Sequence, residues 1–135
     1  MSLVSVRLIT DDVRRMVEFY ETVLGTTASW SNEDFAEVAS TVGTLAIGST
    51  RTVGVFAPRA ARPADNHSAI VEFLVDNVDE EFARLQPTGV DVVREPTTMP
   101  WGNRSLVLRD PDGNLVNLFT PASAATIEKF AHYPR

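Results

Sequence analysis

Two charged side chains, Arg7 and Glu72, occupy equivalent positions in a sequence pattern that the chain repeats. Each stands third in a short, largely apolar run that is typical of a β-strand. A carboxylate can act as a general acid or base, and a guanidinium can bind an anion or hold a nearby carboxylate ionised. The sequence leaves open whether Arg7 and Glu72 form a structural ion pair or a functional one.

Few other residues could perform chemistry. The chain has no cysteine, which excludes disulfides, thiolate catalysis and Cys-based metal sites. Its two histidines are His67, which precedes the second copy of the pattern, and His132, which lies near the end of the chain. We interpret His67 as a solvated loop side chain rather than a ligand or base, and His132 has a weaker claim still.

The repeat predicts the architecture. Residues 5–12 form a strand pattern that leads into a helical pattern ending at Gly25, and residues 70–77 lead into a similar helix ending at Gly89. Both copies are interpreted as βαβββ modules that complete each other. We therefore predict an α+β fold in which residues 1–135 form one domain.

The remaining segments are assigned from strand and turn signals. Asp110-Pro-Asp-Gly-Asn114 is the strongest turn signal, because proline presets φ and Gly113 can adopt a positive φ. In the first copy there are four strand-like runs where the pattern needs three. The predicted parts are module one at about 3–57, with strand-like runs at 27–30, 35–38, 44–48 and 52–57; a linker at about 58–67; module two at about 68–121, with strands at 90–94, 105–109 and 115–120; and a C-terminal helix at about 122–132, capped by Ser123.

Composition sets limits on the function. With 44% hydrophobic and 22% charged residues, the chain can bury a core, and it contains no apolar run long enough to span a membrane. Its start lacks the basic region of a signal peptide, so we expect a cytoplasmic protein. The formal net charge of −6 argues against nucleic acid as a partner and is compatible with a cationic ligand. The scarcity of lysine among the basic residues is typical of a GC-rich bacterial genome.

Two motifs resemble those of a known family. Asp12-Val-Arg-Arg-Met-Val-Glu-Phe-Tyr20 opens the first helix, and Met99-Pro-Trp-Gly-Asn-Arg104 precedes Asp110-Pro-Asp-Gly-Asn-Leu-Val-Asn-Leu-Phe119. Together they resemble the vicinal oxygen chelate superfamily of glyoxalases, bleomycin resistance proteins and extradiol dioxygenases, over roughly residues 3 to 121. The resemblance implies two βαβββ modules that form a curved mixed sheet around a cleft, with helices on the outer face, usually within a dimer.

The metal enzymes of that superfamily carry a His on the first strand of each module and a Glu on a last strand. The resemblance carries these positions to Ser5, Ile70 and Asn117, with Gly54 as the first module's counterpart of Asn117. None of these side chains is a ligand for a catalytic divalent ion. We therefore expect no metal and no other cofactor at this site.

The same resemblance implies a cleft lined by alternate strand residues. On that face we place Arg7, Phe56, Glu72, Asn117 and Phe119, which would form a mostly apolar pocket with a few polar groups. Trp101 matches a Pro-Trp-Gly position of bleomycin resistance proteins, and its indole could stack on a flat ligand at the rim. The alternative is that Trp101 packs in its loop and anchors the final hairpin.

Three functions remain open. The first is a metal-free binding protein of the glyoxalase/bleomycin resistance type, a homodimer that sequesters a small organic molecule, aromatic or cationic, in a cleft. The second is a metal-independent lyase or isomerase that uses Glu72 as general acid or base. The third is a chain that acts through a protein partner. Bound ligand or a thermal-shift screen would separate the third from the others, and product formation would separate the first two.

Overall fold

The structure is a computed structural model that describes residues 1–135, and the chain divides into two compact units. Unit one consists of Met1–His67 together with Pro111–Gly113. Unit two consists of Ser68–Asp110 together with Asn114–Arg135. Each unit contains one copy of the sequence repeat, and each is described by itself. No helix of the chain is both long enough and apolar enough to cross a membrane.

Unit one holds a four-stranded mixed sheet in the order β1-β4-β3-β2. β1 and β4 run parallel, whereas β4, β3 and β2 pair antiparallel. The long helix α1 packs against β3 and β4. The elements are β1 (Ser5–Thr10), α1 (Val13–Leu24), β2 (Ser29–Asn32), β3 (Phe35–Ala39), β4 (Thr44–Ser49) and α2 (Thr50–Phe56).

The local sequence explains α1. The Asp12 side chain accepts a hydrogen bond from the Arg15 amide and so caps the first turn, and Gly25 ends the helix in the left-handed conformation with φ of 62°. The apolar residues that recur at helical spacing are buried, as the period predicts. The buried residues of α1 are Val13, Met16, Val17, Tyr20 and Val23, and they share the core of this unit with Ala36, Val38, Leu45 and Ile47.

Unit two repeats this layout, with a sheet in the order β5-β8-β7-β6. β5 and β8 run parallel, and β8, β7 and β6 pair antiparallel. The long helix α3 packs against β6, β7 and β8. The elements are β5 (Ile70–Leu74), α3 (Val78–Leu85), the 3-10 turn Gln86–Thr88, β6 (Asp91–Thr98), β7 (Asn103–Arg109), β8 (Leu115–Pro121) and α4 (Ala124–Phe130).

Turn and cap residues fix the ends of these elements. The Asn77 side chain accepts hydrogen bonds from the Asp79 and Glu80 amides at the start of α3. In the β7–β8 turn, buried Asp110 accepts from both the amide and the side chain of Asn114, at 2.9 and 2.8 Å. Gly113 in that turn has φ of 83°, as predicted. Ser123 caps α4 through a reciprocal capping box with Thr126.

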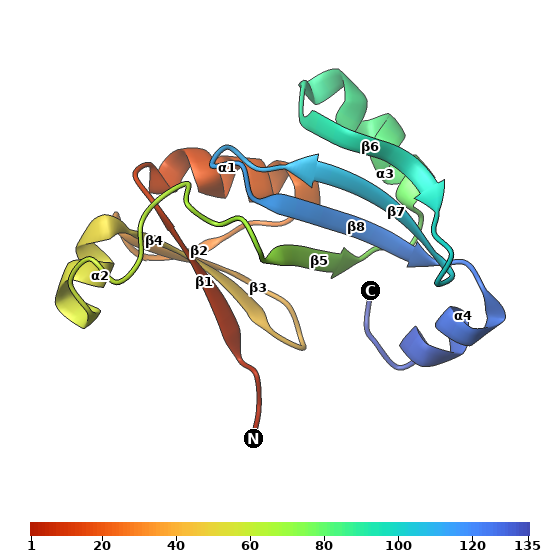
Figure 1. The fold of residues 1–135 in the computed structure, drawn as a ribbon, viewed down its shortest axis with the longest axis horizontal. Coiled ribbons are helices and arrows are strands. Elements are labelled where there is room, and N and C mark those ends of the chain that lie inside the picture. Colours follow the sequence, from red (N-terminus) through yellow and green to blue (C-terminus); the bar gives the residue numbers. More distant parts are fainter. The chain divides into compact units, whose positions relative to one another are not determined.

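One predicted strand is wrong. Residues 52–57 were expected to be β-like, but Thr50–Phe56 forms the helix α2. Ser49 caps this helix by accepting from the Arg51 amide, and the Thr52 hydroxyl donates to the Ser49 carbonyl at 2.7 Å. The helix follows the last strand of unit one, as α4 follows the last strand of unit two (Figure 1). The α+β class and the two βαβββ modules are confirmed, and the repeat extends by one short helix to βαβββα.

Candidate functional site

The candidate site residues that belong to strands lie on one face of each sheet. The other face packs against the long helix, and the residues there that belong to β4, β7 and β8, such as Ile47, Leu106 and Leu118, are fully buried. We call the face opposite the long helix the far face. Because alternate strand residues share a face, the register places Glu72, Asn117 and Ser105 on the far face of unit two. Arg7 and Ala46 lie side by side on the far face of unit one.

Glu72 and Asn117 form a hydrogen-bonded pair on the far face of unit two, where the edge strand β5 meets β8. They are register partners on β5 and β8, and the Asn117 Nδ2 donates to Glu72 Oε2 at 2.7 Å. Glu72 is exposed, whereas the Asn117 side-chain oxygen, Oδ1, is closed off from solvent and has no hydrogen-bond partner. An unpaired buried acceptor costs about 1–3 kcal/mol. Asn117 Oδ1 can therefore accept a hydrogen bond from a ligand while Nδ2 stays bonded to Glu72.

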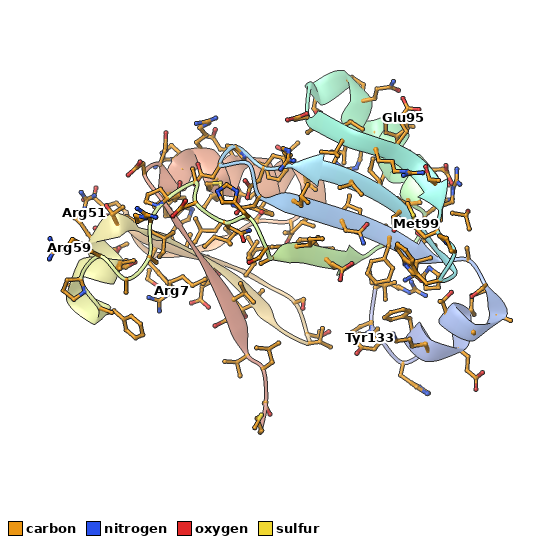
Figure 2. All side chains as sticks on the ribbon, in the orientation of Figure 1. Arg7, Arg51, Arg59, Glu95, Met99 and Tyr133 are labelled. Atoms are coloured by element: carbon orange, nitrogen blue, oxygen red, sulfur yellow. The ribbon has the colours of Figure 1, made fainter.

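Ser105 adds a second unpaired oxygen to the same face. It lies opposite Phe119 across the β7–β8 ladder, is only 2% exposed, and its Oγ has no hydrogen-bond partner. The Phe119 ring contacts the Phe130 ring of α4, with centroids 5.1 Å apart. Phe130 in turn contacts Tyr133, which Figure 2 shows in the segment after α4, at 5.5 Å. Aromatic rings from α4 and the C-terminal segment thus flank the polar groups of this face.

The far face of unit one carries a cation among aromatic rings instead. The Arg7 guanidinium carbon lies 5.3 Å from the centroid of the Phe35 ring and 5.5 Å from that of Phe56. Figure 2 shows Arg7 beside β1 in the region of α2. A Cβ at Gly48 would lie 2.7 Å from the Thr52 hydroxyl oxygen and 3.6 Å from Arg7 Cδ, so glycine leaves the space that these side chains use. Arg7 keeps its N–H donors for other partners.

The register corrects one metal-ligand equivalence. Arg7 pairs with Ala46 as its repeat counterpart Glu72 pairs with Asn117, so the counterpart of Asn117 in unit one is Ala46 rather than Gly54, which lies in α2. The error followed from the strand wrongly predicted at 52–57. The family's ligand positions therefore hold a serine, an isoleucine, an alanine and an asparagine amide. These groups do not fit a catalytic divalent ion, and no three His, Cys, Asp or Glu side chains are grouped to hold a metal.

Trp101 and His67 are both exposed. Trp101 is 66% exposed, and its loop is held to α4 by its neighbour: Gly102 O accepts from the Ala122 and Ser123 amides and from the Thr126 hydroxyl, each at 2.9 Å. The exposure of the indole favours the rim position over the anchor, and the role of Trp101 in ligand binding stays a prediction. The His67 side chain is 84% exposed, and its Nε2 lies 3.7 Å from Asp65.

The structure groups the predicted residues into two sets. Glu72, Asn117 and Phe119 lie together in unit two, whereas Arg7 and Phe56 lie together in unit one. Phe56 reaches Arg7 from a helix rather than from the strand that was predicted. Because Arg7 and Glu72 belong to different units, their pairing stays a prediction.

Sequence reasoning missed three contributors to these sets. Phe35 on β3, Ser105 on β7 and Phe130 on α4 all contact or flank the far faces. Ser105 could have been found by alternation, because it lies two residues before Val107, the register partner of Asn117. Phe35 and Phe130 carried no signal that distinguishes them from core aromatics.

Two ion pairs outside the far faces shift pKa values. In unit one, hydrogen bonds from Arg51 and Ser49 lower the pKa of Asp34, and Arg51 Nη2 lies 2.7 Å from Asp34 Oδ1. In unit two, the Arg104 fork lowers the pKa of Asp79 through contacts of 2.8 and 2.9 Å to its two oxygens. The Arg51–Asp34 pair links the turn between β2 and β3 to α2. The Arg104–Asp79 pair links β7 to the start of α3.

Several bacterial proteins are similar to this chain. The protein YraH of Bacillus subtilis is 27% identical over 125 residues, which cover 88% of this chain and 98% of YraH. The putative glyoxylase CFP32 of Mycobacterium tuberculosis is 31% identical over 117 residues, which cover 85% of this chain. The matched part is 42% of CFP32, so this chain spans less than half of that relative.

Solved structures show the same fold. A glyoxalase/bleomycin resistance protein/dioxygenase family enzyme from Burkholderia phytofirmans aligns with a TM-score of 0.77 at 18% identity, over 90% of this chain and 99% of its own. A glyoxalase/bleomycin resistance protein/dioxygenase from Nocardioides aligns with a TM-score of 0.75 at 23% identity, over 92% and 85%. The model of the glyoxalase/bleomycin resistance protein/dioxygenase superfamily matches residues 2–118, and the chain belongs to this superfamily.

Proposed function

We propose that this chain is a metal-free binding protein that sequesters a small organic molecule on the far face of unit two. The observation that carries the proposal is the Glu72–Asn117 pair, because it fills a metal-ligand position with an amide whose Oδ1 is buried and unpaired. A small-molecule site needs a few placed polar groups in mostly apolar surroundings. Ile70, Leu74 and Phe119 supply apolar surroundings on the same face.

The same proposal places this chain in the bleomycin resistance-like branch of the superfamily. Metal-dependent members of the superfamily need imidazole or carboxylate ligands, and this chain has neither at the equivalent positions. Its ligand would be held by hydrogen bonds and ring contacts instead.

Metal analysis tests the first half of this proposal. Protein purified and dialysed without chelator should contain far less than one equivalent of transition metal. Addition of Ni²⁺, Zn²⁺, Mn²⁺ or Fe²⁺ should leave the melting temperature unchanged, because no ligand set gains binding energy from the ion. One equivalent that survives dialysis and disappears on substitution of Asn117 would contradict the proposal.

A ligand screen tests the second half. We expect a thermal-shift screen of organic compounds to yield at least one stabilising ligand, and Asn117→Leu should abolish its effect while the protein stays folded. The matched control is Asn66→Leu, which removes a side-chain amide from the segment of the chain that connects α2 to β5. A screen in which every stabilising compound binds Asn117→Leu equally well would place the site elsewhere.

The rival function is a metal-independent lyase or isomerase with Glu72 as general acid or base. Its support is that Glu72 is an exposed carboxylate beside a placed amide. Incubation of each ligand with the protein, followed by product analysis, separates the two functions. Turnover that disappears in Glu72→Gln, while ligand binding persists, would replace the binding function with the enzymatic one.

We also propose that the two units act as one cytoplasmic domain in a bacterial homodimer. Support for the dimer comes from apolar side chains at the start of the chain, where Leu3, Val4 and Val6 are 82%, 69% and 48% exposed. A C2 dimer could cover them. Light scattering should give a mass near twice 14.8 kDa. A monomer at micromolar concentration would contradict this part.

A further inference from the structure

We infer that the far face of unit two recognises a protonated amino group, so that the ligand is an organic amine with an apolar or aromatic portion. This inference rests on the proposed function and names its ligand class. It depends on three features of unit two: unpaired buried oxygens, an exposed carboxylate beside them, and aromatic rings that flank them.

Three unpaired oxygens lie on one face of two neighbouring strands. Asn103 Oδ1, Ser105 Oγ and Asn117 Oδ1 are all buried without a hydrogen-bond partner. The continuous β7–β8 register places Asn103 opposite Pro121, Ser105 opposite Phe119 and Val107 opposite Asn117, so all three oxygens belong to the far face. Amide oxygens only accept hydrogen bonds, and a serine hydroxyl can accept them. The three buried oxygens of this face therefore lack hydrogen-bond donors.

The charge beside these oxygens selects a cation. Glu72 is a register partner of Asn117 and receives one N–H from it at Oε2, which leaves Oε1 for a ligand. An ionised carboxylate only accepts hydrogen bonds and repels a ligand carboxylate or phosphate. Diagonal neighbours on paired strands lie about 7–8 Å apart, which leaves room for one amino group between Ser105 and Asn117. An ammonium group, with three N–H donors and a positive charge, matches Glu72, Asn117 and Ser105, whereas Asn103 lies four residues from Val107 along β7 and is out of reach of the same amino group.

Aromatic rings complete the recognition. Phe119 and Phe130 meet edge to face beside Ser105, and ring faces attract ammonium groups. The Phe130 ring already contacts an ammonium, because Lys129 Nζ lies 5.1 Å from its centroid. Because the oxygens are buried, entry of a ligand requires neighbouring side chains to move. The hydrogen bonds to Gly102 hold α4 by its first turn, whereas its last turn contacts the sheet through Phe130.

The test uses three matched compounds. Benzylamine, benzyl alcohol and benzoate carry the same ring with a cationic, a neutral and an anionic group, and spermidine tests an amine without a ring. Two-dimensional amide NMR titrations of the whole protein measure both affinity and location. We expect benzylamine to shift amide signals of β7, β8 and α4, and benzyl alcohol and benzoate to bind at least about tenfold more weakly, as the loss of a charge-assisted hydrogen bond predicts.

Two variants separate recognition from folding. Glu72→Gln keeps the shape and should weaken benzylamine binding by about tenfold to a hundredfold. Ser105→Ala removes an oxygen that has no partner, so it should weaken binding several-fold without lowering the melting temperature. The matched control is Glu95→Gln on β6, at the opposite edge of the sheet from β5 (Figure 2), which should bind like the parent.

The outcomes distinguish failure of this inference from failure of the proposed function. Equal binding of all three benzyl compounds, or equal loss in Glu95→Gln and Glu72→Gln, would overturn the amine assignment. A neutral or anionic compound that binds with a requirement for Asn117 would overturn the amine assignment and leave the binding function standing. Absence of any organic ligand in either screen would overturn both.

Discussion

The two units have the same order of elements, and the far-face positions that they share carry different chemistry. β1 and β4 present Arg7 beside Ala46, whereas β5 and β8 present Glu72 beside Asn117. Two residues further along these strands, Gly48 in unit one corresponds to Phe119 in unit two. The two units therefore share buried apolar side chains at the helix-facing positions, which set the fold. They differ at the far-face positions, which set the ligand chemistry.

The short terminal helices differ in how they are held. α2 begins directly at the end of β4 with Ser49 as its cap, and its Phe56 is 80% exposed although it contacts Arg7. α4 is separated from β8 by a short connection and is fixed through Gly102, and its Phe130 packs between Phe119 and Tyr133. We therefore expect unit two to depend on its terminal helix more than unit one does.

The largest effect should come from Gly102→Ala. Gly102 has φ of 101°, and a Cβ there would overlap the Ser123 side chain, so both the backbone and the α4 cap would be strained. Strain of this kind costs on the order of 1–3 kcal/mol, and the overlap adds to it. Chemical denaturation should show a loss of about 3 kcal/mol in the free energy of unfolding.

Gly54→Ala in α2 is the matched control. Gly54 lies inside a helix with no atom within 4 Å of an added Cβ. Alanine there should stabilise the chain by about 0.5–1 kcal/mol, through helix propensity. Equal losses in the free energy of unfolding from Gly102→Ala and Gly54→Ala would contradict the expected difference between α4 and α2.

The second prediction compares Phe130→Ala with Phe56→Ala. Phe130 is half-buried and contacts two rings, so its truncation should cost about 1–3 kcal/mol. Phe56 is mostly exposed, so its truncation should change the free energy of unfolding by less than about 0.5 kcal/mol. Urea unfolding of both variants measures the difference. A larger loss in Phe56→Ala would mean that the Arg7 contact is stronger than its exposure indicates.

Most of the fold could be predicted from the sequence, because strong local signals decide it. Gly25, the Ser123 cap and the Asp110–Asn114 turn each act over a few residues, and the structure contains all of them. The error at 52–57 has a physical reason. Thr52, Val53, Val55 and Phe56 are residue types that favour a strand, but Ser49 caps a helix there and the sheet already has its four strands.

The candidate site could be predicted only in part. Alternation predicted that Arg7, Glu72 and Asn117 lie on the face opposite the long helices, and the register agrees, because this placement needs only the strand assignment. The unpaired state of Ser105 Oγ and the ring contact between Phe119 and Phe130 depend on how α4 meets the sheet. That contact is set by tertiary packing, for which a single sequence holds no local signal.

The third prediction compares the two serine caps. Ser123 exchanges hydrogen bonds with Thr126 in both directions, whereas the Ser49 side chain accepts one from the Arg51 amide at 3.2 Å and makes another with Asp34. Ser123→Ala should cost about 1–2 kcal/mol and Ser49→Ala about 0.5–1 kcal/mol. Helicity and thermal unfolding, followed by circular dichroism, measure both. A reversed order would show that the reciprocal bond adds less than the hydrogen bond between Ser49 and Asp34.

The smallest effect concerns the two ion pairs and the pH dependence of stability. Arg104 lowers the pKa of Asp79, and it is the only side chain that does so. A lowered folded-state pKa contributes stability that is fully present above the unfolded value, about 3.9, and is lost as the pH falls through the folded value. Arg104→Gln should return the pKa of Asp79 to its ordinary range. The stability difference from the parent should therefore shrink as the pH falls below about 4.

Asp34 in unit one should respond differently to the matched change. Arg51 makes the largest contribution to lowering the pKa of Asp34, but a hydrogen bond with Ser49 lowers it as well. Arg51→Gln should therefore raise the pKa of Asp34 only part of the way, whereas Arg104→Gln should remove the whole shift at Asp79. Carboxyl NMR titrations of both variants measure the two pKa values directly. Complete recovery at Asp34 would show that the Ser49 hydrogen bond does not act on the carboxylate, and that the two units hold their ion pairs in the same way.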